Sequence, residues 1–387
     1  MTGRPGTTAQ PGTTAQPGTA RTPEMAARRA LLMSGSIGMG HNTLAEACTD
    51  TLDADGWHTQ TLDLMQLLGH GGGSVGKAVF RSMLAVPGLY DAFHFAGLRT
   101  GSRLANLTDA AASRQLLPRL RAVLDDARPD LVMSVFATGA SAVSQLAPRY
   151  SAMAHVVLCT DATPHRLWVH ANVDLYLVTS EVAERAVRKF EPDARVLVVP
   201  APVRAAFYNP PTQLQARRNL GLPEQQRCVL LMSGAWGIGP VAQAAEALGN
   251  TGMHVLAVAG RNGRLARRLQ AVARRQPRVR PLGYTNRIPE LMAASDLVIS
   301  SSGDTCTEAR TVGRPLLILD VVQGHGRDNL QHELELGDAA VTSGRPADVV
   351  RAALAALDSA KPPPASPTRS QAAWQNAFAA ALTSLGL

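Results

Sequence analysis

The chain has 387 residues, enough for two domains that each bury a core of their own. Its formal net charge of +8 suits nucleic acid, anionic lipid or nucleotide ligands and does not choose among them. No apolar run reaches the roughly 18 residues that span a bilayer. The N-terminus also lacks the apolar stretch of a secretory signal, so we expect a cytoplasmic protein.

The four cysteines are dispersed along the chain, in apolar or turn segments. None forms a CxxC motif, and no histidine stands at metal-ligand spacing beside them, so we expect no zinc site. They fit reduced core residues of a cytoplasmic protein. The four are Cys48, Cys159, Cys228 and Cys306.

Residues 1–24 are predicted to be a disordered tail, because residues 5–19 repeat Pro-Gly-Thr-Thr-Ala-Gln and cannot bury a core. From Met25 onward, short apolar runs alternate with helical patterns, for example 116–126 and 181–190. Nearly continuous apolar strands between helices are typical of a parallel sheet covered on both faces. The strand-like runs of this first series are 31–34, 59–64, 131–136, 155–159, 175–179 and 196–199.

A second series of the same kind follows the proline-rich stretch 200–212, which we interpret as a linker between domains. We therefore predict an α/β chain with an N-terminal domain over 25–203 and a C-terminal domain over 213–360. Residues 369–387 form a final helix that we expect to pack back towards the N-terminal domain. The strand-like runs of the second series are 229–232, 255–259, 279–283, 297–300, 316–319 and 339–341.

Glycine-rich turns connect a predicted strand to a predicted helix in both halves. Gly35-Ser-Ile-Gly-Met-Gly-His-Asn42 follows the first strand, and Ser302-Gly-Asp-Thr-Cys-Thr-Glu308 follows the fourth strand of the second series. Such turns gather free backbone N–H groups at the positive end of a helix dipole. Leu230–Gly239 repeats the design in the second half. Two such regions in one chain predict two substrates that meet in a cleft between α/β domains.

Together these segments resemble the glycosyltransferases that make monogalactosyl- and glucosyl-diacylglycerol, and the related GlcNAc transferase of peptidoglycan lipid synthesis. The similarity runs from about Leu31 to about Val341 and includes Thr160-Asp161, Pro202-Val203-Arg204 and Gly313-x-Pro315. It implies the GT-B fold, two Rossmann-like domains that face each other across a cleft. It also implies an inverting transfer from a nucleotide sugar without a metal ion. No Asp-x-Asp stands in a plausible loop near either glycine turn.

The resemblance assigns acceptor and catalytic roles to the first half. His41 matches the family's proposed general base, and histidine titrates in the range that suits that task. Asp161 matches a residue that orients the acceptor or shares the base role. Gly40, Asn42, His165 and Trp168 match the acceptor side. A capping histidine at position 41, and a buried aromatic with a hydrogen-bonded histidine at 168 and 165, are the structural alternatives.

Donor binding is assigned to the second half. Glu308 is expected to accept hydrogen bonds from the ribose hydroxyls; alternatively, it is a first-turn carboxylate that serves the helix dipole. The diphosphate is expected to lie along the glycine turns, with Asn262 and the backbone at 287–288 bordering the base. The predicted nucleotide-sugar residues are Ser233, Gly234, Gly237, Asn262, Arg287, Ile288, Gly303, Asp304, Thr305, Glu308, His325 and Asn329.

One segment departs from the family pattern. The family has Gly-Gln-Glu and then Asn before a helix, where the amide and carboxylate hold donor-sugar hydroxyls. This chain has Gly324-His-Gly-Arg-Asp-Asn329, and a serine run at 300–302 replaces the usual lysine of the phosphate loop. The sugar identity therefore does not carry over; His325 or Asp320 substitutes, or the sugar site is impaired.

The segment 71–121 contains seven Lys or Arg residues together with several aromatic ones. Basic residues beside exposed apolar ones are typical of a surface for anionic lipid. The alternative is a solvated face over an ordinary core. The seven are Lys77, Arg81, Arg99, Arg103, Arg114, Arg119 and Arg121.

We therefore expect a UDP-sugar-dependent hexosyltransferase that modifies a diacylglycerol-like lipid at the cytoplasmic face of the membrane. A transferase for a soluble acceptor and a catalytically impaired binding protein of the same fold remain as alternatives. No cofactor, metal or nucleic-acid partner is expected, since no nucleic-acid motif accompanies the positive charge.

Overall fold

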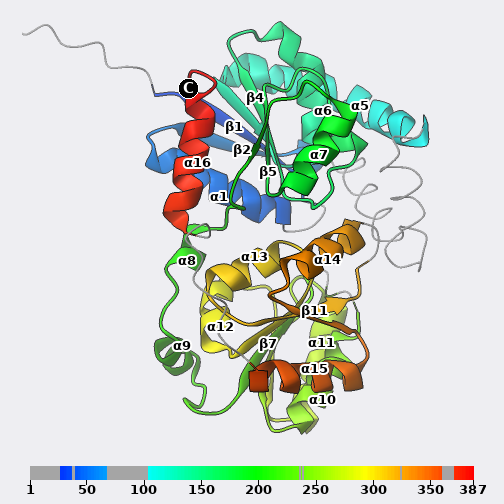
Figure 1. The fold of residues 1–387 in the computed structure, drawn as a ribbon, viewed down its shortest axis with the longest axis vertical. Helices are drawn as coiled ribbons and strands as arrows, with labels where there is room; N and C mark the ends of the chain where they lie inside the picture. Colours follow the sequence, from blue (N-terminus) through cyan, green and yellow to red (C-terminus); the bar gives the residue numbers. More distant parts are fainter. Residues whose placement is uncertain are drawn as a thin grey trace, which may run out of the picture.

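The computed structural model describes residues 27–36, 40–67, 103–234, 237, 239–322, 325–359 and 370–387, with only the backbone for 103–114 and 325. This part of the chain forms two six-stranded parallel sheets, one in each half (Figure 1). Their apolar strands bury residues on both faces, as the sequence predicts. The predicted class, two Rossmann-like domains, is confirmed.

The first sheet has the order β2-β1-β3-β4-β5-β6. Along β1, Leu31 and Met33 pack on one face while Ala30 and Leu32 pack on the other, because successive strand residues alternate. Its strands are β1 Arg29–Ser34, β2 His58–Asp63, β3 Leu131–Ser134, β4 Ala154–Cys159, β5 Leu175–Val178 and β6 Val196–Val198. Its helices are α1 Gly40–Ala54, α2 Leu64–Leu67, α5 Arg103–Ala127, α6 Ala137–Leu146 and α7 Glu181–Phe190, with short 3₁₀ turns η2 Ala147–Arg149 and η3 Arg166–Trp168.

The second sheet has the order β12-β11-β10-β7-β8-β9, the strand order of a dinucleotide-binding Rossmann fold. Val229 and Leu231 pack on one face and Leu230 on the other. Its strands are β7 Cys228–Met232, β8 His254–Val258, β9 Val279–Leu282, β10 Leu297–Ser301, β11 Leu316–Asp320 and β12 Ala340–Ser343. Its helices are α10 Val241–Asn250, α11 Gly263–Arg275, α12 Ile288–Ala294, α13 Asp304–Thr311, α14 His325–Leu336 and α15 Pro346–Ser359.

Two short helices, α8 Ala205–Tyr208 and α9 Gln213–Leu220, lead from the first half to the second. The proline-rich stretch 200–212, which we interpret as the linker, therefore contains a short helix. Phe207 is fully buried and packs with Val203 in the core of the second half. These two apolar residues fix the stretch to that core, which explains why it forms structure despite its prolines.

The last helix, α16 Gln371–Thr383, lies on the first half beside α1 (Figure 1). Trp374 and Phe378 are buried among residues of β1, β3 and β4. The Trp374 indole N–H also donates to the Thr51 hydroxyl of α1 at 2.9 Å. The C-terminal end of the chain thus completes the core of its N-terminal half.

Candidate functional site

In both sheets, the strand order reverses where the predicted site residues lie. The reversal falls between β1 and β3 in the first sheet and between β7 and β10 in the second. Ligands of open parallel sheets bind outside the carboxyl ends of the strands at such a reversal. His41 follows β1, and the donor-side turns follow β7 and β10. The topology therefore places both groups where a ligand can bind.

His41 is held at one of its two ring nitrogens. Its Nδ1 lies 2.8 Å from the carbonyl oxygen of Val135, just after β3. A carbonyl oxygen only accepts, so Nδ1 carries the hydrogen, and Nε2 of the neutral ring presents a lone pair. None of the described residues hydrogen-bonds to Nε2. The ring centroid lies 5.0 Å from that of Phe136 and 6.1 Å from that of Trp168.

The acceptor-side motif forms a small network beside His41. The Trp168 indole N–H donates to Asp161 Oδ2 at 2.8 Å, and the ring is 3% exposed. His165 Nδ1 accepts from the Leu167 N–H at 3.3 Å and caps the short turn that carries Trp168. Trp168 thus contacts Asp161 directly, and His165 caps the turn that carries Trp168.

Asn42 also has a partner within the first half. Its side-chain oxygen accepts from the Ser34 hydroxyl at 2.5 Å, at the end of β1. This bond ties the first turn of α1 to the strand that precedes it. The fold therefore fixes the position of Asn42, which is next to His41 in the chain.

Glycines allow the donor-side turns to fold tightly. Gly234 and Gly237 both have φ of +56°, and a Cβ at Gly237 would lie 2.3 Å from the Leu265 side chain of α11. Gly303 has φ of +143° at the start of α13. Residues with a side chain rarely adopt these backbone angles, so glycine is needed at each turn. The buried Ser233 hydroxyl has no partner among the described residues and can donate to a phosphate oxygen there.

Glu308 lies one turn into α13 and is 9% exposed. Burial and, to a lesser extent, the Asp304 carboxylate raise the pKa of its carboxyl to about 8, against the opposing effect of the Arg204 guanidinium. No hydrogen bond to this carboxyl is found in the described part of the chain. A buried carboxyl without partners is ready to accept hydrogen bonds from ligand hydroxyls.

Several of the remaining predicted donor-side residues have a structural role in the fold. Asn262 caps α11 by accepting from the N–H groups of Arg264 and Leu265 at 3.1 and 3.0 Å. Arg287 pairs with Glu290 at 2.6 Å, and Ile288 is buried at the start of α12. Thr305 is partly buried in the first turn of α13. Their predicted roles around the base and diphosphate stay predictions.

The two halves contact each other through predicted site residues. The Thr160 hydroxyl donates to Asp304 Oδ1 at 3.3 Å, and the Ala162 N–H donates to Asn329 Oδ1 at 3.0 Å. A Cβ at Gly40 would lie 2.4 Å from Asp304 Oδ2, so α1 and α13 approach closely at their N-termini. Figure 1 shows α13 and α14 on the side of the second half that faces the first. The acceptor and donor sides are thus adjacent.

The altered sugar segment opens α14. His325 is its first residue, with a side chain outside the described set, and Gly326 is buried as its second residue. A Cβ at Gly326 would lie 2.3 Å from Val322 Cγ1. The Gly326 carbonyl accepts from the Ser302 hydroxyl at 2.8 Å, which ties this segment to the turn after β10. The local packing therefore excludes the family's larger residue at 326 unless Val322 changes.

Three contributors to the site have no role that the sequence predicts: Val135, Phe136 and Arg204. A backbone carbonyl such as that of Val135 leaves no residue-type signal. Arg204 belongs to the Pro-Val-Arg motif, which marks its position but not its function. Its buried Nε has no hydrogen-bond partner in the described residues, and its guanidinium pairs with Glu46 only at 3.8 Å.

Metal ligands and membrane spans are both absent from the part of the chain that the structure describes. No group of three or more His, Cys, Asp or Glu side chains in it is placed to hold a metal ion. None of the helices it forms combines the length and the apolar character needed to cross a membrane. Of the basic aromatic segment 71–121, residues 71–102 lie outside the described part of the chain.

Two family models match parts of the chain. Residues 41–203 match the model of monogalactosyldiacylglycerol (MGDG) synthase, and residues 239–348 match the C-terminal domain of glycosyltransferase family 28. The chain therefore resembles the glycolipid synthases of the GT-B class, as its motifs predict.

Individual relatives are similar over part of their length. A probable chloroplastic MGDG synthase of Nicotiana tabacum is 31% identical over 62% of this chain and 48% of its own. A processive diacylglycerol beta-glucosyltransferase of Bacillus pumilus is 30% identical over 49% of this chain and 51% of its own. The chain thus spans about half the length of the curated relatives it matches. The structure of sucrose-phosphate synthase from Thermosynechococcus elongatus matches 92% of this chain over 98% of its own length. The TM-score is 0.59 and the sequence identity is 15%, so the match shows a shared fold.

Proposed function

We propose that this chain, which resembles the glycolipid synthases, transfers a sugar from a UDP-sugar to the hydroxyl of a diacylglycerol-like lipid. One observation carries the proposal. His41 is locked through Nδ1 to Val135, and the neighbouring Gly40 lies against Asp304 at the start of the donor-side helix α13. A base with a free lone pair therefore lies beside the helix N-terminus that suits a diphosphate.

In the proposed reaction, His41 Nε2 takes the proton of the acceptor hydroxyl as that oxygen attacks the anomeric carbon. The bond between that carbon and UDP breaks, and UDP leaves with the electron pair. Attack opposite the leaving group inverts the anomeric centre. The Val135 carbonyl keeps the ring in the reactive tautomer and accepts a hydrogen bond from the imidazolium that forms. We propose that Asp161, which accepts a hydrogen bond from the Trp168 indole, positions the acceptor.

The donor side is proposed to bind UDP without a metal ion. Backbone N–H groups of the turns at 233–237 and 303–305 compensate the charge that develops on the diphosphate, together with the α13 dipole. The unpartnered Ser233 hydroxyl supplies a further donor. Glu308 accepts from the ribose hydroxyls once its proton has left.

The protein is proposed to bind the membrane surface through residues 71–121. Seven basic residues, each worth about 1 kcal/mol near an anionic surface, are ample even if only half reach it. Co-sedimentation with anionic and neutral vesicles tests this part. Recovery with anionic vesicles alone, weakening with salt, supports it. Equal recovery with both, or none with either, contradicts it.

The altered segment at 324–326 favours one alternative, a protein that binds the nucleotide but has lost sugar transfer. The decisive experiment measures UDP release from a panel of UDP-sugars, with and without vesicles that contain diacylglycerol, in buffer with and without EDTA. Lipid-dependent release that survives EDTA supports the proposal. Release without lipid in the presence of a small alcohol indicates a soluble acceptor. UDP binding without any release indicates the binding protein.

A further inference from the structure

A second polar pocket lies at the end of the C-terminal sheet that is opposite the carboxyl ends of its strands. It has a volume of about 380 Å³ and is open to solvent where β7, β10 and β11 begin. The catalytic cleft lies at the other ends of these strands, so the pocket is separate from it. Its lining residues are Arg217, Gln225, Arg227, Asp296, Gly313, Arg314, Pro315 and Leu357.

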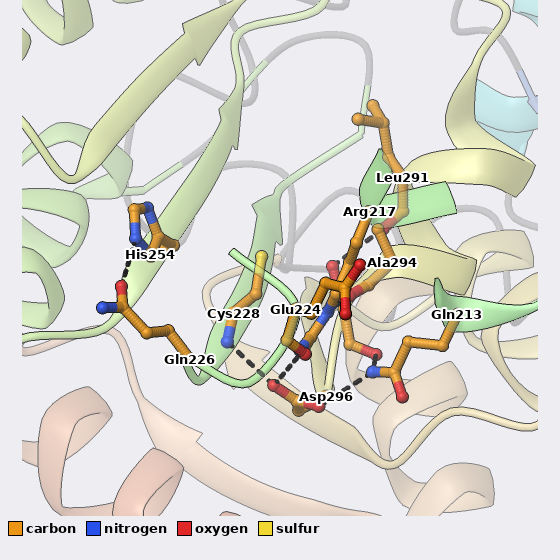
Figure 2. A network of polar contacts seen from close by, with 10 residues as sticks. Gln213, Arg217, Glu224, Gln226, Cys228, His254, Leu291, Ala294 and Asp296 are labelled. Carbon is orange, nitrogen blue, oxygen red and sulfur yellow. Dashed lines mark hydrogen bonds and ion pairs between the residues drawn. The ribbon is translucent and has the colours of Figure 1, made fainter. Parts of the chain in front are cut away.

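Both oxygens of the single carboxylate in this lining already accept hydrogen bonds. Asp296 Oδ2 accepts from Arg217 Nη2 at 2.7 Å and from the Cys228 N–H at 2.8 Å. Its Oδ1 accepts from the Gln213 amide at 2.8 Å, and Figure 2 shows these partners around it. The Arg217 side chain is 5% exposed, and its Nε donates to the Ala294 carbonyl at 2.9 Å. Asp296 and Arg217 therefore neutralise each other within the wall of the pocket.

The positive charges of the other two arginines of the lining are less well compensated. Arg314 forms no ion pair within the described chain, and its Nε is buried without a hydrogen-bond partner. Burial lowers the pKa of its guanidinium, and neighbouring Arg217 lowers it further, while Asp296 raises it. Arg227 pairs only with Asp358 at 2.7 Å, where both side chains are about half exposed or more. Such a pair is weak, so Arg227 can turn to another anion.

We propose that this pocket binds a small oxyanion of the phosphate class, either free phosphate or the phosphomonoester headgroup of a lipid. A guanidinium offers paired donors whose geometry matches phosphate oxygens. An anion between Arg314 and Arg227 supplies the counter-charge that Arg314 lacks among the ion pairs of the described residues. Because the pocket opens away from the cleft, the bound anion is not the donor diphosphate.

The test is calorimetry of the full chain with inorganic phosphate in the presence of saturating UDP, which occupies any phosphate site in the cleft. Arg314→Gln removes the charge and keeps most of the side-chain volume. Arg268→Gln is the matched control, since Arg268 lies exposed on α11 of the same domain. Arg217 is left intact because its loss would strand the Asp296 carboxylate.

Wild type and Arg268→Gln are expected to bind phosphate with equal affinity, and Arg314→Gln about tenfold or more weakly. Arg314→Gln should also melt no lower than wild type without phosphate, and it should lose the rise in melting temperature that phosphate gives. Absence of phosphate binding by the wild type, or equal binding by Arg314→Gln, overturns the proposal.

Vesicles of phosphatidylcholine, with and without phosphatidic acid, distinguish the two sources of the anion. Phosphatidic-acid binding that Arg314→Gln weakens, relative to Arg268→Gln, identifies the lipid headgroup. Phosphate binding that depends on Arg314, with vesicle binding that does not, identifies free phosphate.

Discussion

The His41 ring has one fixed nitrogen and one free nitrogen, and this asymmetry leads to the first prediction. His41→Ala should lower turnover by about 10²–10⁴, because proton transfer in the transition state is lost. UDP affinity should change little, since no donor-side contact is removed. Steady-state kinetics and calorimetry measure the two effects. The control is His58→Ala at an exposed position on β2, which should leave both unchanged. Full activity of His41→Ala excludes it as the base.

Glu308 gives the second prediction. Glu308→Ala should weaken UDP binding by about 1.5–3 kcal/mol, the usual worth of hydrogen bonds to a charged group. The control is Glu335→Ala, an exposed residue of α14. Calorimetry that shows unchanged UDP affinity in a folded Glu308→Ala protein argues against the ribose contact.

The raised pKa of Glu308 gives the third prediction. Hydrogen bonds from ribose favour the charged carboxylate, so UDP binding should release a proton between the ordinary pKa of 4.5 and the folded value of about 8. Repeating the titration at pH 7 in buffers of different ionisation enthalpy measures the release, which Glu308→Gln should remove.

The same group also sets a pH dependence of stability. In the free protein, the folded state keeps this proton after the unfolded chain has lost it. Glu308 therefore makes the free energy of unfolding fall as pH rises from about 4.5 to about 8, and level off above. Glu308→Gln should flatten this part of the curve. An unchanged slope would mean that the carboxyl titrates normally.

At the scale of elements, the start of α14 decides what the sugar segment can hold. Gly326→Glu places a Cβ 2.3 Å from Val322 Cγ1 and 2.6 Å from Val322 Cβ. The double change His325→Gln with Gly326→Glu should therefore cost about 1–3 kcal/mol of stability through overpacking. Adding Val322→Gly removes both contacting atoms and should recover most of that loss. Thermal melts compare the three proteins.

The triple variant, with His325→Gln, Gly326→Glu and Val322→Gly, also tests sugar selectivity. We expect the unmodified protein to discriminate weakly among UDP-sugars, because the amide and carboxylate that would read sugar hydroxyls are absent. The triple variant should gain selectivity for UDP-glucose or UDP-galactose. If the unmodified protein already prefers one of these by about a hundredfold, roughly 2.7 kcal/mol, other residues hold the sugar.

At the scale of the whole molecule, two hydrogen bonds join the halves beside the cleft, from Thr160 to Asp304 and from Ala162 to Asn329. Thr160→Val with Asn329→Ala removes both, each worth about 0.5–1.5 kcal/mol. Small-angle scattering should then show a larger radius of gyration with little change in melting temperature. The control is Thr59→Val, which loses a bond to Asp53 within the first half. An unchanged radius means that these bonds do not determine how far apart the two halves lie.

Local sequence patterns determined the strands, most of the helix positions and the class of fold. Apolar runs of four to six residues must be buried on both faces, and glycine turns before helices mark the ligand edge whatever the tertiary arrangement. These patterns were therefore enough to locate the site segments along the chain. These patterns did not predict the helix α8 within the proline-rich stretch 200–212, because that helix depends on a distant core that buries Phe207.

Only the tertiary structure decided contacts between segments that are far apart in the chain. The tautomer of His41 rests on the backbone carbonyl of Val135, 94 residues away, and a carbonyl is common to every residue type. The high pKa of Glu308 rests on burial and on the nearby Asp304 carboxylate, which together outweigh the Arg204 guanidinium. The conflict between Gly326 and Val322, and the unpartnered Arg314, are likewise matters of packing. A sequence lists donors, acceptors and charges, but the fold sets which of them meet and how much water remains between them.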